Sequence, residues 1–326
     1  MKFPRRTFLK FAAASVAVPT FSHVATAQTY PSRPITMIVP APPGGILDSV
    51  GRVLAERMKG TLGQPVIIEN VSGADGSIGV GRLARAKPDG YTIDPGFLGG
   101  HVLNGALYSL PYDLLNDFEP ITPLAAGAVV LYARRTIQAK DLSELTAWLK
   151  ANPGNASAAV DAAGPRLLYM LFQKETGTHF ALVPYRGGSP AVQDLVAGQI
   201  DLFLESSFWL PLVRGGSIKA YAVTSDARLA AAPDIPTFAE MGLPAVSWSA
   251  WYGFFAPRGT LKDITAKLNT AAVEALADPA VRSRLADFGL EIFPREQQTP
   301  EALGALVKAD AKKWWPLIKE FGISAG

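Results

Sequence analysis

Hydrophobic and polar positions along the chain follow two different periods. Short apolar runs of strand length occupy residues 35–39, 66–70, 128–133, 199–205 and 220–225. Amphipathic runs with helical spacing occupy residues 141–154, 189–198, 261–277, 279–288 and 300–321. Strands that alternate with helices in this way predict the α/β class with mostly parallel sheets.

The helix expected over 141–154 carries its own end signals. Asp141 is a residue type that caps helix N-termini, Glu144 follows three positions later, and Gly154 stands at the end. The helix over 189–198 likewise begins with Ser-Pro and ends in glycine. These signals place helix boundaries from local chemistry alone.

Loops of small residues follow several strand-like runs. They are "APPGG" (41–45), "SGADG" (72–76), "FLGGH" (97–101) and "AAVDAAGPR" (158–166). Ligands of open α/β sheets bind beyond the carboxyl ends of strands, so these loops indicate one shared ligand cleft. In the first loop, glycines let backbone N–H groups approach a ligand closely, and the next helix begins with unpaired donors. This combination predicts an anion site without a charged side chain.

Residues 1–27 have the pattern of a secretory signal. Four basic residues flank the weakly apolar stretch 11–18, and "ATA" (25–27) is a small-x-small cleavage site. "RRTFLK" (5–10) resembles the twin-arginine export motif, although Pro4 replaces the usual Ser or Thr. We expect cleavage after Ala27 and a mature protein in the periplasm.

Removal of this segment changes the charge balance. The whole chain has 31 basic and 28 acidic residues, and the segment holds four of the basic ones and none of the acidic. The balance therefore becomes slightly acidic, and no basic patch indicates a nucleic-acid partner. The chain has no cysteine, which excludes disulfides and thiolate metal sites.

Motifs of catalysis are absent from the sequence. His101 and His179 are the histidines that follow the signal segment, and no H-E-x-x-H, G-x-S-x-G or P-loop pattern occurs. "GVGRLA" (79–84) matches a dinucleotide fingerprint but lies inside an expected helix. His101 either contacts a ligand or caps a helix, and His179 belongs to a turn or strand edge. We expect no catalytic residue, no cofactor and no metal site.

Long stretches of the chain resemble one receptor family. They are residues 30–93, "LPYDLLNDFEPITPLA" (110–125), "VPYRGGSPAVQDLVAGQIDLFLE" (183–205) and "WYGFFAPRGT" (251–260). They resemble the Bug receptors, TctC-like substrate-binding proteins of tripartite tricarboxylate transporters. The resemblance implies a two-lobed periplasmic binding protein (type II-like) with a ligand cleft between the lobes, each lobe a mostly parallel sheet flanked by helices. It places lobe I at 28–125 and 228–326 and lobe II at 126–227, with crossings near 125 and 227.

The same resemblance implies roles for individual residues. The loop Pro42–Asp48 should grip a carboxylate through backbone amides and ordered water, with Pro43, Gly44, Gly45 and Ile46 as the cradle. Asp48 should hold the loop or a water by hydrogen bonds. In the second lobe, members carry S-G-x-G-S-x-x-H-L, whereas residues 159–167 here lack both serines and both glycines of that pattern, and Arg166 replaces the histidine. The candidate ligand-binding residues are Pro43, Gly44, Gly45, Ile46, Asp48, Asp75, Gly76, His101, Asp161, Ala162, Ala163, Arg166, Glu205, Phe208 and Trp209.

The departures in the second lobe leave two interpretations of Asp161 open. It either pairs with Arg166 outside the cleft, or it faces a ligand with one carboxylate and an aromatic, amide-bearing or cationic far end. Phe208 and Trp209 would add aromatic surface.

The function expected from these features is capture of a small organic acid. We expect a monomeric receptor that delivers its ligand to membrane transporter subunits. The first alternative is a ligand sensor that contacts a sensor kinase of a two-component system. The second is an exported hydrolase on the same scaffold, against which the lack of a recognisable nucleophile–base pair argues.

Overall fold

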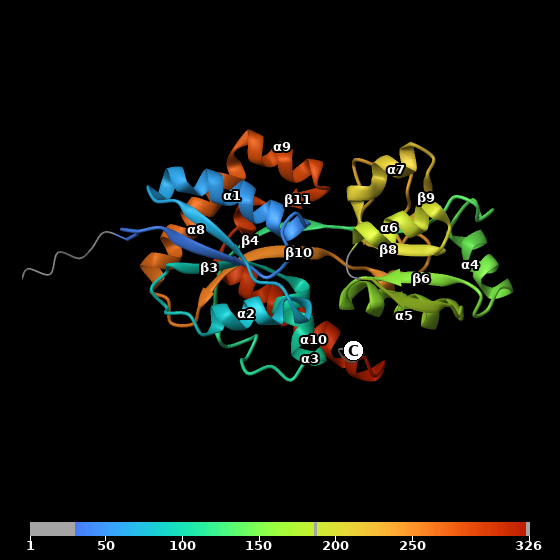
Figure 1. Ribbon diagram of the computed structural model, residues 1–326, viewed down its shortest axis with the longest axis horizontal. Helices are drawn as coiled ribbons and strands as arrows, with labels where there is room; N and C mark the ends of the chain where they lie inside the picture. The colour runs from blue at the N-terminus through green and yellow to red at the C-terminus, as the bar shows by residue number, and fades with distance from the viewer. Residues whose placement is uncertain (1–29, 186–187, 324–326) are drawn as a thin grey trace, which may run out of the picture.

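The computed structural model describes residues 30–185 and 188–323. The predicted signal segment and its cleavage site lie outside these residues. No helix within the described ranges has both the length and the apolar character needed to cross a bilayer. The described residues form two groups of strands and helices that lie side by side (Figure 1).

The first lobe contains a six-stranded sheet in the order β11-β4-β10-β3-β1-β2. Its strands are β1 (Ile35–Val39), β2 (Val66–Asn70), β3 (Thr92–Phe97), β4 (Phe118–Gly127), β10 (Ala250–Pro257) and β11 (Leu290–Ile292). One face is covered by α1 (Ile46–Leu62), α8 (Lys262–Ala277) and α9 (Pro279–Asp287). The other is covered by α2 (Ser77–Ala84), α3 (Asn104–Leu107) and α10 (Pro300–Glu320).

The second lobe contains a five-stranded sheet in the order β7-β6-β8-β5-β9. Its strands are β5 (Val129–Arg134), β6 (Ser157–Val160), β7 (Ala181–Pro184), β8 (Leu202–Ser206) and β9 (Ile218–Val223). One face packs against α6 (Gly188–Ala197) and α7 (Leu210–Arg214), and the other against α4 (Leu142–Ala151) and α5 (Ala163–Thr176). Short helical turns occur at Ala74–Gly76, Gly99–Leu103, Ser207–Trp209, Pro244–Val246 and Arg295–Gln297.

The α/β class and the two helix-flanked sheets are confirmed, but the sheets are mixed rather than mostly parallel. In the first sheet β1 pairs in parallel with β2 and β3, whereas β10 runs antiparallel to β3 and β4. In the second, β6 is parallel to β7 and β8, whereas β5 is antiparallel to β8 and β9. The strands β4, β5 and β10, which form antiparallel pairs, adjoin the crossings between the lobes. Their direction is set by the connectivity of the chain, and hydrophobic periodicity does not reveal connectivity.

The chain leaves the first sheet at the end of β4 and enters the second at Val129. It returns later than the expected position 227. Thr237 forms a bridge with Val223, and Leu229 packs in the second-lobe core. The Trp248 N–H still donates to the Thr224 carbonyl, and β10 begins at Ala250. We therefore place the second crossing at residues 248–250.

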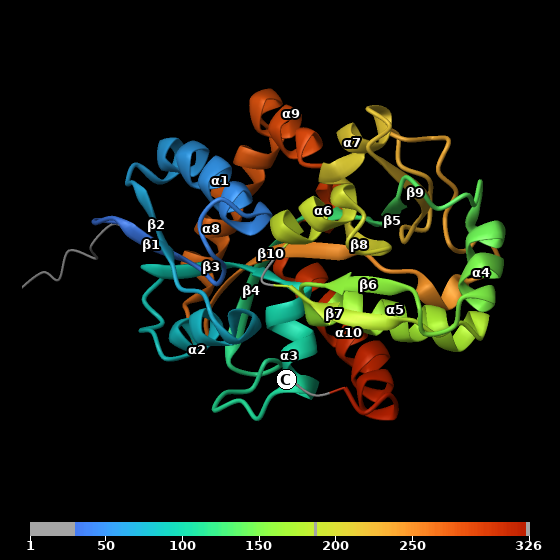
Figure 2. The same cartoon turned by 45° about the vertical axis from the view of Figure 1, so that its right-hand side comes forward.

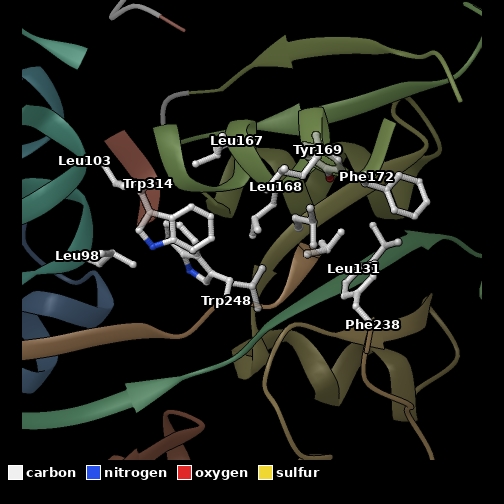
Figure 3. Packing of buried hydrophobic residues seen from close by; sticks show 14 of the residues in the cluster. Leu98, Leu103, Leu131, Leu167, Leu168, Tyr169, Phe172, Phe238, Trp248 and Trp314 are labelled. Carbon is white, nitrogen blue, oxygen red and sulfur yellow. The ribbon is translucent and has the colours of Figure 1, made fainter. Parts of the chain in front are cut away.

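One hydrophobic cluster runs from the first lobe into the second (Figure 3). The rings of Trp248 and Trp314 lie 4.8 Å apart, and Trp314 is fully buried, as expected for a core residue. Leu98 and Leu103 of the first lobe and Leu167 of the second belong to the same cluster. The lobes therefore share apolar packing on one side.

Candidate functional site

The loop between β1 and α1 is held by a buried carboxylate. Asp48 accepts hydrogen bonds from the Gly44 N–H at 2.9 Å, from Arg52 Nε at 2.9 Å and from Asn70 Nδ2 at 2.8 Å. Burial raises the pKa of Asp48, but the hydrogen bonds from Arg52, Gly44 and Asn70 outweigh it, so the pKa lies below its ordinary value. Asp48 thus organises the loop. The expectation that Gly44 offers its amide to a ligand is wrong for this conformation, because that amide donates to Asp48.

The N-terminus of α1 remains available for an anion. Gly45 is its N-cap and provides no side-chain hydrogen bond, while residues 42–45 are exposed. The first N–H groups of a helix have no intrahelical acceptor and carry a partial positive charge. Ile46, the first residue of α1, is among these donors. This end of α1 lies on the side of the first lobe that faces the second (Figures 1 and 2).

Two further helices begin uncapped at the ends of strands. The N-cap of α2 is Gly76 and that of α5 is Ala162, and neither makes a side-chain capping bond. In contrast, α4, α9 and α10 are capped by Asp141, Asp278 and Thr299. α8 and the short helices α3 and α7 also begin without such a cap. Available N–H donors therefore occur in both lobes, at loops that the sequence predicts to line the cleft.

The loop after β2 adopts a left-handed backbone over four consecutive residues. The φ angles are 122° at Gly73, 47° at Ala74, 49° at Asp75 and 89° at Gly76. A Cβ at Gly76 would lie 2.9 Å from the Pro40 carbonyl oxygen, so the close approach of the loop to β1 requires glycine. Asp and Asn are enriched among non-glycine residues in this region, which helps to explain how Asp75 is tolerated.

Two side chains that the sequence analysis missed hold this loop. Asn104 Nδ2 donates to the Asp75 carbonyl oxygen at 2.9 Å, and the Tyr108 hydroxyl donates to Asp75 Oδ2 at 2.9 Å. Asn104 is the first residue of α3 and Tyr108 is its C-cap, with an extended backbone, so helical spacing alone would not have paired them. The carboxylate of Asp75 is exposed and fixed by Tyr108.

His101 neither faces the cleft nor caps a helix in this structure. Its side chain is 1% exposed, stacks on Phe255 with ring centroids 4.2 Å apart, and places Nε2 3.4 Å from Asp94 Oδ2. Neither side chain finds a hydrogen-bond partner among the described residues. Burial lowers the pKa of His101 to about 3 and raises the pKa of Asp94 well above its ordinary value. His101 is therefore a core residue, whereas His179 is exposed between α5 and β7.

Two carboxylates meet at the strand ends of the second lobe. β6 and β8 are parallel neighbours with Ala159 opposite Phe203, which brings Asp161 and Glu205 together. An ideal Cβ on Gly188 would lie 3.6 Å from Asp161 Oδ2 and 3.5 Å from Glu205 Oε2. Burial, the charge of Glu205 and a hydrogen bond with it raise the pKa of Asp161 to about 9. Asp161 therefore holds a proton at neutral pH.

The remaining second-lobe candidates divide by exposure. Arg166 is exposed and forms no ion pair within the described part of the chain, so pairing with Asp161 is not observed there. Ala162 is exposed and Ala163 half-buried at the start of α5. Phe208 is 50% exposed, whereas Trp209 is half-buried and packs against the second-lobe core, with its ring 5.0 Å from that of Phe208.

The loops of the two lobes come close to each other. The charge of Asp75 in the first lobe contributes to the raised pKa of Asp161 in the second. The Ser207 hydroxyl, after β8, donates to the carbonyl oxygen of Gly289, before β11, at 3.3 Å. The carboxylates of Asp75, Asp161 and Glu205 therefore lie in one region where the two lobes approach each other, whereas His101 and Asp48 are buried within the first lobe. A separate surface cavity of about 760 Å³ lies between α8 and α10, away from these loops.

Comparisons with known proteins agree on one family. The model of the TctC family, described as tripartite tricarboxylate transporter family receptor, matches residues 50–323. Protein BugT of Bordetella pertussis is 35% identical, and the match covers 95% of this chain and 94% of BugT. MatC of Rhodopseudomonas palustris with bound malate is 38% identical over 89% of this chain and 100% of that one, with a TM-score of 0.81. R. palustris Rpa4515 with adipate is 30% identical over 90% and 99%, with a TM-score of 0.82.

Proposed function

The chain belongs to the tripartite tricarboxylate transporter receptor family, and from this premise we propose that it captures a small organic acid in the periplasm. The two lobes close on the ligand, and the loaded receptor delivers it to the membrane subunits of a tripartite tricarboxylate-type transporter. Two relatives of solved structure carry malate and adipate, which supports a carboxylate as the group recognised.

The observation that carries this proposal is the uncapped N-terminus of α1. Its N–H groups and partial positive charge favour an anion, and Gly45 provides no competing side chain. Arg52, the nearby cation, already pairs with Asp48. The carboxylate of a ligand would therefore be held by backbone donors, with Pro43, Gly45 and Ile46 around it.

The connections between the sheets support the proposal that the lobes close. The chain passes between lobes at the β4–β5 junction and again at the start of β10, while the shared cluster around Trp248 and Trp314 packs on one side. Such an arrangement suits a hinge about the crossings. Closure would bring the α1 N-terminus and the Asp161 loop onto opposite ends of one ligand.

We propose no catalytic step for this site. His101 and Asp94 have the residue types of a catalytic pair, but His101 is 1% exposed. Within the described ranges, neither ring nitrogen of His101 forms a hydrogen bond with a side chain that could act as a nucleophile.

The test is to identify the ligand on the mature protein, residues 28–326. Mass spectrometry of small molecules released from the denatured purified protein should reveal an organic acid. The identified acid at 100 times its Kd should then stabilise the protein by about 2.7 kcal/mol. Small-angle scattering should show a smaller radius of gyration with ligand bound. If no organic acid is released and none in a broad panel stabilises the protein, or if the bound molecule is turned over, the proposal is wrong.

A further inference from the structure

Thr224 lies where both crossings meet the second lobe. It directly follows β9 and is 1% exposed. The Val129 N–H donates to Thr224 Oγ1 at 2.9 Å, and the Thr224 N–H donates to the Val129 carbonyl oxygen at 2.9 Å. The Thr224 carbonyl oxygen accepts the Trp248 N–H at 2.8 Å. One buried residue of the second lobe is thus bonded to the first crossing at Val129 and to the second crossing at Trp248.

The first sheet holds both crossings two residues away. Gly127, the last residue of β4, pairs with Ala250 of β10 on one side and with Leu290 of β11 on the other. An ideal Cβ on Gly127 would lie 2.8 Å from Leu290 Cδ2, so the strands are closely packed there. Gly127 and Ala250 are therefore fixed parts of the first lobe.

A single residue of each crossing lies between these attachments. It is Ala128 on the first crossing and Ser249 on the second, and neither belongs to a helix or a strand. Hinges consist of a few residues at the ends of elements that absorb changes of φ and ψ. The dihedral angles of Ala128 and Ser249 can change without breaking any of the attachments described above.

The side chain of Trp248 lies close to these two residues and contacts both lobes. Its ring is 4.8 Å from that of Trp314 on α10 of the first lobe (Figure 3). In the second lobe, an ideal Cβ on Gly164 of α5 would lie 2.8 Å from Trp248 Cζ2. Atoms near a rotation axis are displaced little when two bodies rotate. The packing of Trp248 can therefore persist while the lobes rotate about the neighbouring Ser249.

We propose that Thr224 is the positioning residue of the hinge, and that its three hydrogen bonds confine rotation between the lobes to Ala128 and Ser249. This inference rests on the proposed function, because it assumes that the lobes move relative to each other. Without the Thr224 hydroxyl, the buried N–H of Val129 loses its partner at the start of β5. Rotation then extends into β5, and the lobes sample a wider range of separations.

Distances between spin labels on the mature protein, without ligand, measure this range directly. The chain has no cysteine, so labels attach only at introduced ones. The inter-lobe pair is Thr270→Cys on α8 and Ser143→Cys on α4, both exposed. The pair within the second lobe is Ser143→Cys and Gln193→Cys on α6. Pulsed electron paramagnetic resonance gives the distribution of distances for each pair.

Thr224→Val removes the hydroxyl at nearly constant volume. We expect the inter-lobe distribution to become roughly 1.5-fold wider, because the bond that confines Val129 is lost, while the distribution within the second lobe stays unchanged. Thr224→Ser keeps the hydroxyl and should retain the width of wild type. Thr237→Val is the matched control, because Thr237 is also 1% exposed and its hydroxyl accepts a backbone N–H, that of Glu240. It should change neither distribution.

Two serines on either side of Trp248 locate the hinge by a second route. Glycine increases backbone freedom wherever it replaces another residue. Ser249→Gly should widen the inter-lobe distribution, whereas Ser247→Gly, on the second-lobe side of the bond to Thr224, should leave it unchanged. Ser249 is exposed and Ser247 is half-buried, so neither change opens a cavity in the core. This comparison decides the proposal even where Thr224→Val fails to fold.

The outcomes distinguish the two proposals. Equal widths in folded Thr224→Val and wild type, equal broadening in Thr237→Val, or equal effects of Ser247→Gly and Ser249→Gly overturn the hinge assignment and leave the receptor function standing. Failure of every carboxylate in a broad panel to bind overturns the receptor function, and it is measured separately from the distances in the ligand-free protein.

Discussion

Asp94 Oδ2 lies 3.4 Å from His101 Nε2, and both side chains are buried in the core of the first lobe, where the His101 ring packs against Phe255 and Phe118. These two polar side chains are surrounded by apolar residues. Burial raises the pKa of Asp94 well above its ordinary value and lowers that of His101 to about 3. Burial therefore favours the neutral form of both side chains, so the folded pair holds one proton, on Asp94, at every pH between the lowered pKa of His101 and the raised pKa of that carboxyl.

This pair should make stability fall at alkaline pH. Between about pH 4 and 6.5 these two side chains also hold one proton in the unfolded chain, on His101. The pair therefore does not change the free energy of unfolding with pH in this range. Above about pH 6.5 the unfolded chain loses that proton while folded Asp94 keeps its own. The free energy of unfolding should then fall by about 1.4 kcal/mol per pH unit until the folded pKa of Asp94 is reached.

Urea unfolding of wild type and Asp94→Asn between pH 5 and 9 checks this prediction. Asp161, with a pKa of about 9, also makes stability fall as the pH rises. Because both proteins contain Asp161, the difference between their stability curves reports Asp94 alone. In Asp94→Asn, the free energy of unfolding should no longer fall above pH 6.5 on account of Asp94. Below pH 6.5 it should rise with pH, because His101 is protonated in the unfolded chain and neutral in the folded one. Parallel curves for the two proteins from pH 7 to 9 would show that Asp94 is ionised in the fold.

Gly45 and Gly44 should respond differently to a side chain. A Cβ on Gly45 meets nothing closer than the Pro42 oxygen at 3.7 Å, whereas Gly44 has a φ of +82°. Gly45→Val should therefore cost less than about 1 kcal/mol in stability as an N-cap change, but weaken ligand binding by about 2 kcal/mol. Gly44→Ala should cost about 1–2 kcal/mol in stability from its left-handed backbone. Calorimetry and thermal melts measure both, and unchanged affinity in folded Gly45→Val would mean that the loop only turns the chain.

Ala74 carries backbone strain that glycine should relieve. Its φ is +47° within the left-handed loop that Asn104 holds. Ala74→Gly should raise the free energy of unfolding by about 0.5–1 kcal/mol, because the gain from relief exceeds the entropy that glycine loses. The matched control is Ala147→Gly on the exposed face of α4, which should lower it by about 1 kcal/mol. Equal losses in both variants would show that the loop holds Ala74 without strain.

Local chemistry explains which features the sequence could predict. Asp141 accepts the Glu144 N–H at 2.8 Å, as the capping signal predicted, since all atoms involved lie within one helical turn. The burial of His101 could not be predicted in the same way. It depends on Phe255 from a strand that follows more than 150 residues later, and one sequence contains no signal for that pairing.

The same distinction applies to the loops and the lobe boundary. The Pro-Gly-Gly stretch indicated an anion loop, but not that Asp48 would occupy the Gly44 amide, because loop conformation decides which amides remain available. The second crossing was placed too early. The bridge between Val223 and Thr237 keeps the intervening segment on the second lobe, and that segment has no strand-like period of its own.

Substitutions at Ser207 and Gly289 can test whether the contact between these residues forms only when the lobes close. A Cβ on Gly289 would lie 1.8 Å from Ser207 Oγ across the lobes, and the φ of Gly289 is +73°. Gly289→Ala combines a strain within the first lobe with a clash between lobes. If the contact forms only when the lobes close, the clash should weaken ligand binding by about 1–3 kcal/mol. Adding Ser207→Gly removes the clash and leaves the backbone strain.

A double-mutant cycle separates the two effects, because only the clash involves both residues. Calorimetry on wild type, Ser207→Gly, Gly289→Ala and the double variant should show affinity lost in Gly289→Ala and largely recovered in the double variant. Scattering of ligand-saturated Gly289→Ala should give a larger radius of gyration than that of wild type. A loss of stability at unchanged affinity would mean instead that Ser207 and Gly289 already touch in the open receptor, since a contact present in both states cannot oppose closure.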